Sequence, residues 1–303
     1  MSAFEEWLAQ GPWPIDGGLS GELEKRGHDL SDDLWSARLL RDDPESIAQV
    51  HRDYVAAGAR VIITASYQAS RRGFMTTGLS QMQADELIAK SVVLARRVAQ
   101  EAQHHVWVAA SVGPYGAVLG GGQEYHGNYG VSHSELVSFH RERIAVLAQV
   151  QPDLFACETI PDIAEVNALL EVLVDYPNIP AWITMSCADG THTCAGQLMS
   201  DLAVVTRDHA NVVAIGANCT KPEYITGLFT LLREKSSKPF VVYPNAGRIW
   251  DGDNHAWMGE GNDTLDTSAI KQWEALGTSL IGGCCGLGPV AIHAIDNQLT
   301  ALR

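Results

Sequence analysis

Short runs of apolar and β-branched residues alternate with longer amphipathic segments along the whole chain. Each run has the length of a strand that is buried on both faces, which is typical of a parallel sheet. The alternation predicts seven strands. A shorter eighth strand is predicted before Gly17, because it continues the regular strand–helix alternation of the other seven. The predicted strands are residues 13–16, 60–65, 106–111, 154–157, 181–185, 212–217, 240–243 and 280–283.

The segments between these runs carry helical patterns and helix-start signals. Asp43 precedes Pro44 at a first-turn position, and the residues from Ser80 to Gln83 fit a capping box. Strict alternation of strands and helices, in eight units over about 300 residues, favours a closed (β/α)8 barrel over an open sheet. With no Pro/Ser/Gly-rich linker, we predict one domain over residues 1–303. The predicted helices are residues 44–57, 80–102, 133–150, 162–176, 201–209, 223–235, 264–276 and 289–301.

The composition narrows the classes of ligand. Lys and Arg number 21 against 36 Asp and Glu, a formal net charge of −15, while 46% of residues are hydrophobic. This balance argues against nucleic acid and anionic membrane surfaces as partners, and leaves small molecules. The apolar runs are far shorter than the ~18 residues of a membrane span. The N-terminus lacks the pattern of a signal peptide, so we expect a cytoplasmic protein.

A glycine-rich stretch, GGGQEYHGNYG at residues 120–130, does not open a helix directly after a strand. A nucleotide-binding loop requires that context, so we reject this function. A long loop in a barrel of this kind is typical of a lid or binding loop. We expect residues 120–130 to form a long mobile loop over the barrel mouth.

Reactive side chains follow the predicted strands at their carboxyl ends. Active sites of barrels lie at this end, so the side chains that follow different strands are expected to meet. They include two carboxylates, an amide and three thiols, namely Asp16, Glu158, Asn245, Cys219, Cys284 and Cys285.

The three thiols suggest a zinc site. Zinc prefers a tetrahedron, and three protein ligands leave the fourth position to a substrate. Buried thiols that merely pack are the competing interpretation, because free cysteine is often a core residue. A sphere of three thiolates is too electron-rich to polarise water well, but it suits a sulfur as fourth ligand. The pattern therefore favours attack by a bound thiol on carbon over hydrolysis.

Several motifs resemble those of the homocysteine S-methyltransferase family, above all a vicinal cysteine pair with an upstream Asn-Cys. The resemblance covers essentially the whole chain and is greatest to the S-methylmethionine-dependent branch. The motifs are Asp16-Gly17-Gly18, ITASYQ at 63–68, SVGPYG at 111–116, Cys157-Glu158-Thr159, GANC at 216–219, Tyr243-Pro244-Asn245 and GGCC at 282–285.

The resemblance implies that Cys219, Cys284 and Cys285 hold Zn²⁺, which binds the homocysteine thiolate for methylation to methionine. It also implies that Asp16 and Glu158 receive the homocysteine ammonium, with the Gly17 backbone nearby and Thr159 and Tyr67 at the substrate. A carboxylate is a suitable partner for an ammonium group. From the residues alone, Asp16 could equally form an Asp-Gly turn, and Glu158 could be a helix-start carboxylate.

The methyl donor stays open. Gly286-Leu287-Gly288-Pro289 resembles the betaine-dependent branch, whereas other motifs point to a sulfonium donor such as S-methylmethionine or S-adenosylmethionine. Tyr67, Tyr115 and Trp250 are candidates to face a sulfonium, because aromatic faces attract cations.

Two further hypotheses concern the thiol site. Asn245 is a candidate fourth zinc ligand in the resting state, with water as the competing occupant. The alternative to an enzyme is a zinc-binding or redox-sensing barrel without turnover. The remaining thiols, Cys157, Cys187 and Cys194, are explained by ordinary packing or exposure.

Overall fold

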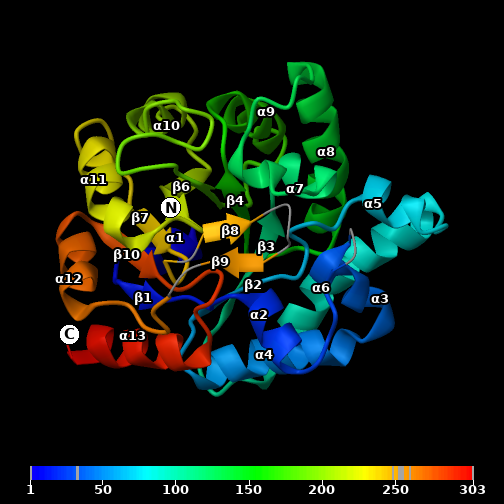
Figure 1. The fold of residues 1–303 in the computed structure, drawn as a ribbon, viewed down its shortest axis with the longest axis horizontal. Coiled ribbons are helices and arrows are strands. Elements are labelled where there is room, and N and C mark those ends of the chain that lie inside the picture. The colour runs from blue at the N-terminus through cyan, green and yellow to red at the C-terminus, as the bar shows by residue number, and fades with distance from the viewer. Residues whose placement is uncertain (1, 32–33, 248, 252–255, 259–260, 302–303) are drawn as a thin grey trace.

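In the computed structural model, which describes residues 2–31, 34–247, 249–251, 256–258 and 261–301, eight parallel strands form a ring with helices outside it (Figure 1). Their spatial order is β1-β10-β7-β6-β5-β4-β3-β2. A parallel bridge between Ile15 and Val61 joins the two ends of this series. The strands are β1 Trp13–Pro14, β2 Val61–Ile63, β3 Trp107–Val112, β4 Leu154–Ile160, β5 Ala181–Met185, β6 Val212–Asn218, β7 Phe240–Tyr243 and β10 Thr278–Ile281.

The predicted (β/α)8 barrel is confirmed, and every predicted strand overlaps an observed one. Each strand leads to a helix that packs on the outside of the ring, as a parallel arrangement requires. The capping box at Ser80 and the Asp43 cap are both present. The outer helices are α4 Pro44–Ala56, α6 Gln81–Glu101, α8 His133–Gln149, α9 Ile163–Leu173, α10 Ser200–Val205, α11 Pro222–Arg233, α12 Thr267–Ala275 and α13 Pro289–Ala301.

Shorter elements depart from the prediction. The helix predicted over 201–209 ends at Val205, and a two-stranded antiparallel sheet follows β7 where no strands were predicted. These elements are too short for periodicity to detect. They are α1 Ala3–Leu8, α2 Leu19–Lys25, η1 Trp35–Arg38, α3 Leu39–Asp42, α5 Arg71–Thr76, α7 Gly116–Leu119, η2 Gln123–Tyr125, β8 Ile249–Asp251 and β9 Ala256–Met258.

Two hydrophobic cores follow from the alternation of side chains along each strand. Ala156 and Trp182 belong to the smaller core, which fills the barrel interior, while Phe155 and Ile183 belong to the larger core under the helices. Phe4 and Leu8 of α1 also pack into the smaller core, so this helix covers the amino-terminal end of the barrel. The opposite end is left for the loops that follow the strands.

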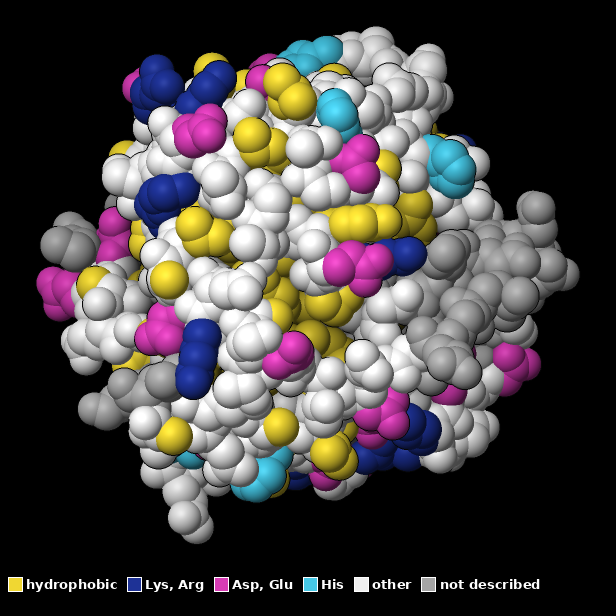
Figure 2. All heavy atoms as spheres, turned by 60° about the vertical axis from the view of Figure 1, so that its left-hand side comes forward, with side chains coloured by type: hydrophobic (Ala, Val, Ile, Leu, Met, Phe, Trp, Pro, Cys, Tyr) yellow, Lys and Arg dark blue, Asp and Glu magenta, His cyan; other side chains and the backbone are white. Residues whose placement is uncertain are grey.

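The molecular surface mixes charges of both signs. On the face that Figure 2 shows, acidic and basic side chains are interspersed with hydrophobic ones. The excess of 15 negative charges is thus not gathered into one acidic field on this face. Among the described residues, no helix combines the length and apolar character needed to cross a bilayer.

Close packing between β6 and β7 predicts a strong effect of one methyl group. A Cβ on Gly216 would lie 1.8 Å from the carbonyl oxygen of Val241, whereas a Cβ on Gly21, within α2, would meet nothing within 4 Å. Gly216→Ala should therefore lower the free energy of unfolding by at least about 2 kcal/mol, because backbone must move. Gly21→Ala should raise it by about 0.5–1 kcal/mol, as expected for a helix interior. Urea unfolding monitored by circular dichroism measures both, and equal midpoints for the two variants would contradict this packing argument.

Candidate active site

A cavity of about 100 Å³ opens at the carboxyl ends of the barrel strands. Residues from seven strand ends or the loops that follow them contribute to it, which is why positions far apart in the sequence meet here. Glu124 and Tyr125 come from the loop between β3 and β4. Its lining is Asp16, Gly17, Gly18, Leu19, Ser20, Trp35, Ser36, Ile63, Thr64, Ala65, Tyr67, Glu124, Tyr125, Glu158, Thr159, Cys219, Tyr243, Gly283, Cys284 and Cys285.

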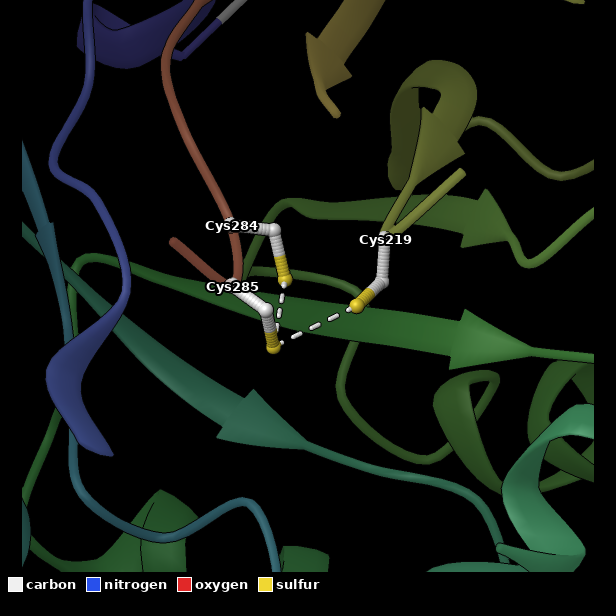
Figure 3. A group of neighbouring side chains, drawn as sticks. All are labelled: Cys219, Cys284 and Cys285. Atoms are coloured by element: carbon white, nitrogen blue, oxygen red, sulfur yellow. Dashed lines mark hydrogen bonds between the residues drawn. The ribbon is translucent and has the colours of Figure 1, made fainter. Parts of the chain in front are cut away.

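Three thiols point toward one another at one wall of this cavity (Figure 3). The sulfur of Cys285 lies 3.6 Å from that of Cys219 and 3.9 Å from that of Cys284, and all three lie within 4.8 Å of one another. Sulfurs bound at about 2.3 Å in a tetrahedron are about 3.8 Å apart. The spacing of this thiol cluster, Cys219, Cys284 and Cys285, therefore fits a tetrahedral metal ion with one position left over.

The thiols of the cluster influence one another's protonation. Hydrogen bonds from Cys284 and Cys285 lower the pKa of Cys219 well below its usual value. The pKa values of Cys284 and Cys285 are raised, first of all by the hydrogen bond each makes to Cys219. Negative charge is thus favoured on the sulfur at the end of β6, and a thiolate is the form that binds metal.

The backbone at Cys219 is held in an unusual conformation. Its φ of 45° lies in the left-handed region, which is unfavourable for a residue with a side chain. The Cys219 N–H donates to the carbonyl of Tyr243 at 3.0 Å, and its carbonyl accepts from Asn245 Nδ2 at 3.3 Å. These two hydrogen bonds stabilise the turn that directs the Cys219 sulfur toward Cys285.

Asn245 thus lies beside the thiol cluster. Its amide oxygen accepts a hydrogen bond from the Gly247 N–H at 2.9 Å, and Asn245 does not line the cavity. To bind a metal in the resting state, this oxygen would have to leave the turn. The role of Asn245 as fourth ligand stays a prediction.

Asp16 and Glu158 are the two deepest carboxylates of the cavity, with 3% and 7% of their surface exposed. Asp16 accepts a hydrogen bond from the Ile63 N–H at 2.7 Å, and Glu158 accepts one from the Ser111 hydroxyl. Burial raises the pKa of Asp16 well above its usual range and that of Glu158 to about 7. Two carboxyl groups in this environment favour a cation as their ligand.

Thr159 and Tyr67, both expected near the substrate, also line the cavity. Thr159 has a φ of 60°, and Asn218 holds it from both sides. The Thr159 N–H donates to Asn218 Oδ1 at 2.7 Å, while Asn218 Nδ2 donates to Thr159 Oγ1 at 2.7 Å. Asn218 therefore links the ends of β4 and β6, one residue away from Cys219.

Gly17 lies where the loops after β1 and β10 touch. A Cβ at this position would be 2.3 Å from the Leu287 carbonyl oxygen and 2.9 Å from the Tyr54 ring. Only glycine allows this close approach. The contact brings Asp16 and the thiols of Cys284 and Cys285 into one cavity.

The other three cysteines lie outside the thiol cluster. Cys157 points to the core beneath the helices, because it is one position out of phase with Glu158 on β4. Cys187 is buried with its sulfur 3.9 Å from that of Met199, and Cys194 is partly buried in the same loop region. These contacts agree with ordinary packing.

Tyr115 and Trp250, the other two aromatic residues expected to face a sulfonium, are not among the described residues that line the cavity. The hydroxyl of Tyr115 donates to Glu135 at 2.9 Å and accepts from Arg72 at 3.1 Å, and Tyr115 does not line the cavity. The side chain of Trp250 lies outside the described part of the chain.

Several residues that line the cavity were not predicted as site residues from the sequence, and four of them have large aromatic or acidic side chains. Trp35 and Tyr243 line the wall, and Glu124 and Tyr125 enter from the loop at 120–130, which lies over the barrel mouth as expected. The Tyr125 hydroxyl is 3.0 Å from the Cys219 sulfur. The Glu-Tyr pair within a glycine-rich loop was the available signal, because such a loop brings its few large side chains to the site.

A buried arginine supports the loop that carries Tyr67. Arg143 of α8 donates to the carbonyls of Ser66 and Tyr67 at 3.1 and 2.8 Å, and to that of Gly113 at 3.1 Å. Burial lowers its pKa to about 10, so it stays charged near neutral pH. Arg143 thereby connects the loops after β2 and β3.

Comparisons with known proteins decide the family. A family model described as Homocysteine S-methyltransferase matches residues 15–299. The chain belongs to the homocysteine S-methyltransferase family. It is 41% identical over 302 residues to Homocysteine S-methyltransferase YbgG of Bacillus subtilis (strain 168), with 95% of each chain covered. It is 42% identical over 316 residues to Homocysteine S-methyltransferase 2 of Zea mays, with 98% of this chain and 93% of the relative covered.

Solved structures agree. The homocysteine methyltransferase MmuM from Escherichia coli, in its metallated form, matches with a TM-score of 0.86 and 39% identity over 97% of this chain and 98% of that one. Its oxidized form matches with a TM-score of 0.88 and 38% identity over 98% and 100%. The predicted family and the assignment as an enzyme are confirmed, which removes the alternative of a barrel without turnover.

The thiol cluster predicts a sharp division among the six cysteines. Cys219→Ala, Cys284→Ala and Cys285→Ala should each lose stoichiometric zinc, because two thiolates supply too few ligands. Cys157→Ala, Cys187→Ala and Cys194→Ala should keep it. Zinc is measured by mass spectrometry on dialysed protein, and full zinc content in Cys285→Ala would exclude the cluster as the metal site.

The buried hydrogen bonds of Arg143 predict that its substitution lowers the free energy of unfolding more than substitution of Arg141, the other arginine of α8. Arg143→Met should lower the free energy of unfolding by about 3 kcal/mol or more, because three carbonyls lose a charged donor. Arg141, an exposed partner of Asp175, is the matched control, and Arg141→Met should cost at most about 1 kcal/mol. Urea unfolding tests both, and similar losses would show that the buried hydrogen bonds of Arg143 contribute little.

Proposed function

We propose that this chain transfers a methyl group from a sulfonium donor to the sulfur of homocysteine, forming methionine, with zinc held by Cys219, Cys284 and Cys285. The observation that carries the proposal is the sharing of one cavity by the thiol cluster and by two buried carboxylates, Asp16 and Glu158. Homocysteine carries both matching groups, a thiol and an ammonium. The names of the relatives support the same acceptor.

Zinc suits this donor set on two grounds. The sulfur spacings of 3.6 and 3.9 Å agree with the tetrahedral value of about 3.8 Å, and three thiolates are soft ligands. Bound zinc would lower the pKa of the thiol that completes its tetrahedron and so supply a nucleophile at neutral pH. A metallated form of the E. coli relative supports a metal ion at this site.

The residues of the chain would orient the acceptor. Asp16, which follows β1, and Glu158, on β4, would receive the ammonium from two sides, with the Gly17 backbone beside them. Thr159, held by Asn218, and Tyr67, held through its carbonyl by Arg143, complete the wall. With its ammonium fixed, the acceptor sulfur is directed toward the thiol cluster.

A sulfonium is the donor that needs the least help from the protein. The carbon–sulfur bond of the donor breaks with its electron pair going to the donor sulfur, and the pair of the acceptor thiolate forms the new bond. The donor leaves as a neutral thioether, so no proton has to be delivered to it. The sequence motifs that resemble the S-methylmethionine-dependent branch support S-methylmethionine as donor.

One assay tests this function. Purified protein is supplied with homocysteine and with S-methylmethionine, S-adenosylmethionine or betaine in parallel, and methionine is quantified with zinc content on the same sample. We expect the highest turnover with S-methylmethionine, and loss of activity on chelation that zinc restores. Highest turnover with betaine would instead favour the branch that Gly286-Leu287-Gly288-Pro289 resembles.

The positions of Asp16 and Glu158 predict that their substitution weakens the use of homocysteine and leaves zinc binding unchanged. Asp16→Asn and Glu158→Gln should each raise the KM for homocysteine by about 10- to 100-fold, because one charged contact to an ammonium is lost, and leave zinc bound. Asparagine at 16 retains an oxygen for the Ile63 N–H, so the fold is preserved. If both variants use homocysteine like the wild type, these carboxylates do not bind the ammonium.

If Asn245 is the fourth zinc ligand in the absence of substrate, X-ray absorption spectra with and without homocysteine should differ. Asn245→Ala should retain zinc, and its X-ray absorption spectrum without substrate should change only slightly as water replaces the amide oxygen. In both proteins, homocysteine should replace the light atom by a fourth sulfur. Three sulfurs and one oxygen at saturating homocysteine would contradict the proposed binding of the acceptor thiolate.

A further inference from the structure

Glu124 occupies a position in the cavity that the proposed acceptor does not explain. It precedes Tyr125, whose hydroxyl lies 3.0 Å from the Cys219 sulfur, so η2 is seated directly over the thiol cluster. The backbone carbonyl of Glu124 accepts a hydrogen bond from the Ser186 hydroxyl at 3.2 Å. These contacts on both sides hold the Glu124 side chain at the cavity.

The Glu124 carboxylate is not paired with a cationic side chain of the part of the chain that the structure describes. No Lys, Arg or His side chain of the described residues forms an ion pair with it, and His126, two positions along the chain, lowers its pKa less than burial raises it. Glu124 is only partly exposed, and burial raises its pKa to about 7. A partly buried carboxylate without a partner is costly by itself and becomes favourable when a ligand brings a cation.

The cavity therefore holds three carboxylates in two places. Asp16 and Glu158 lie deep, at the ends of β1 and β4, and suffice for the single ammonium of homocysteine. Glu124 comes from the loop over the mouth and is more exposed. A second substrate would reach the cavity from this side, and a sulfonium amino acid carries two positive charges, one on sulfur and one on its ammonium.

The reaction distinguishes between these two charges. The positive charge on sulfur disappears as the methyl group leaves, so a carboxylate beside it would stabilise the ground state more than the transition state and slow the transfer. The ammonium charge is the same before and after the transfer. A contact to it adds affinity without opposing the chemistry.

We infer that Glu124 binds the α-ammonium group of the methyl donor, so that the enzyme selects sulfonium donors that are α-amino acids. This inference rests on the proposed function. It assigns separate carboxylates to the two substrates, Asp16 and Glu158 to the acceptor and Glu124 to the donor.

The test is steady-state kinetics with homocysteine and S-methylmethionine both varied. Glu124→Gln should raise the KM for S-methylmethionine by about 10- to 100-fold, the usual effect of losing one charged contact. The kcat should change little, because the contact is equal in ground and transition states. The KM for homocysteine and the zinc content should stay within about twofold of the wild type. Glu124→Asp, which keeps the charge, should recover part of the donor affinity.

Two controls make the result specific. Glu234→Gln removes the same charge after α11, at the opposite end of the barrel, and should leave both KM values unchanged. Dimethylsulfoniopropionate is a sulfonium without an ammonium group, and it is measured as a donor and as an inhibitor against S-methylmethionine. Its kinetic constants should be the same for the wild type and Glu124→Gln.

Two outcomes would overturn the inference. An unchanged KM for S-methylmethionine in Glu124→Gln would show that this carboxylate does not bind the donor. An equal loss for both sulfonium compounds would place its effect on the sulfonium or on the loop, not on the ammonium. Failure of the proposed function is seen separately, because the wild type itself would then form no methionine from homocysteine and S-methylmethionine.

Discussion

Closure of the barrel at Asp16 is the constraint on which the rest of the structure depends. Strand β1 contributes only Trp13–Pro14 to the ladder, and the ring is joined to β2 by the Ile15–Val61 bridge. The Asp16 N–H donates to the Val61 carbonyl at 3.1 Å, and its carboxylate accepts from the Ile63 N–H at 2.7 Å. A buried carboxylate that is satisfied by the backbone therefore completes the sheet and lines the cavity at the same time. Closure brings all the strand ends to one rim.

The site is built at some expense to stability, as is common for functional sites. Cys219 and Thr159 both have left-handed backbone conformations, and hydrogen bonds from neighbouring strands offset the strain. Burial raises the pKa values of Asp16 and Glu158, which means that their charged forms are disfavoured without a ligand. The same features that cost stability in the free protein become favourable when a cationic amino acid and a metal ion are bound.

The fold was largely predictable because it repeats. Eight buried runs separated by amphipathic segments indicate the barrel, and the rule that sites lie at the carboxyl ends of strands identifies Asp16, Glu158 and the cysteines as neighbours. The short elements were not predictable, since α1 and η2 are each less than two turns long and are stabilised by tertiary packing. The position of the loop at 120–130 over the mouth could be predicted from the sequence. Which of its side chains enter the cavity could not, and Glu124 and Tyr125 were missed for this reason.

The sequence by itself determined the order of strands and helices, the strand ends at which chemistry collects and, through its motifs, the family. Only the tertiary structure decided which side chains meet. Cys157 and Glu158 are adjacent in the chain, yet the period of two along β4 sends one to the helices and the other into the cavity. Cys219 and Cys285 are 66 residues apart, and their sulfurs come within 3.6 Å only because the loops after β6 and β10 converge past β7. Local patterns encode the elements, whereas such distances depend on ring closure, which every strand contributes to.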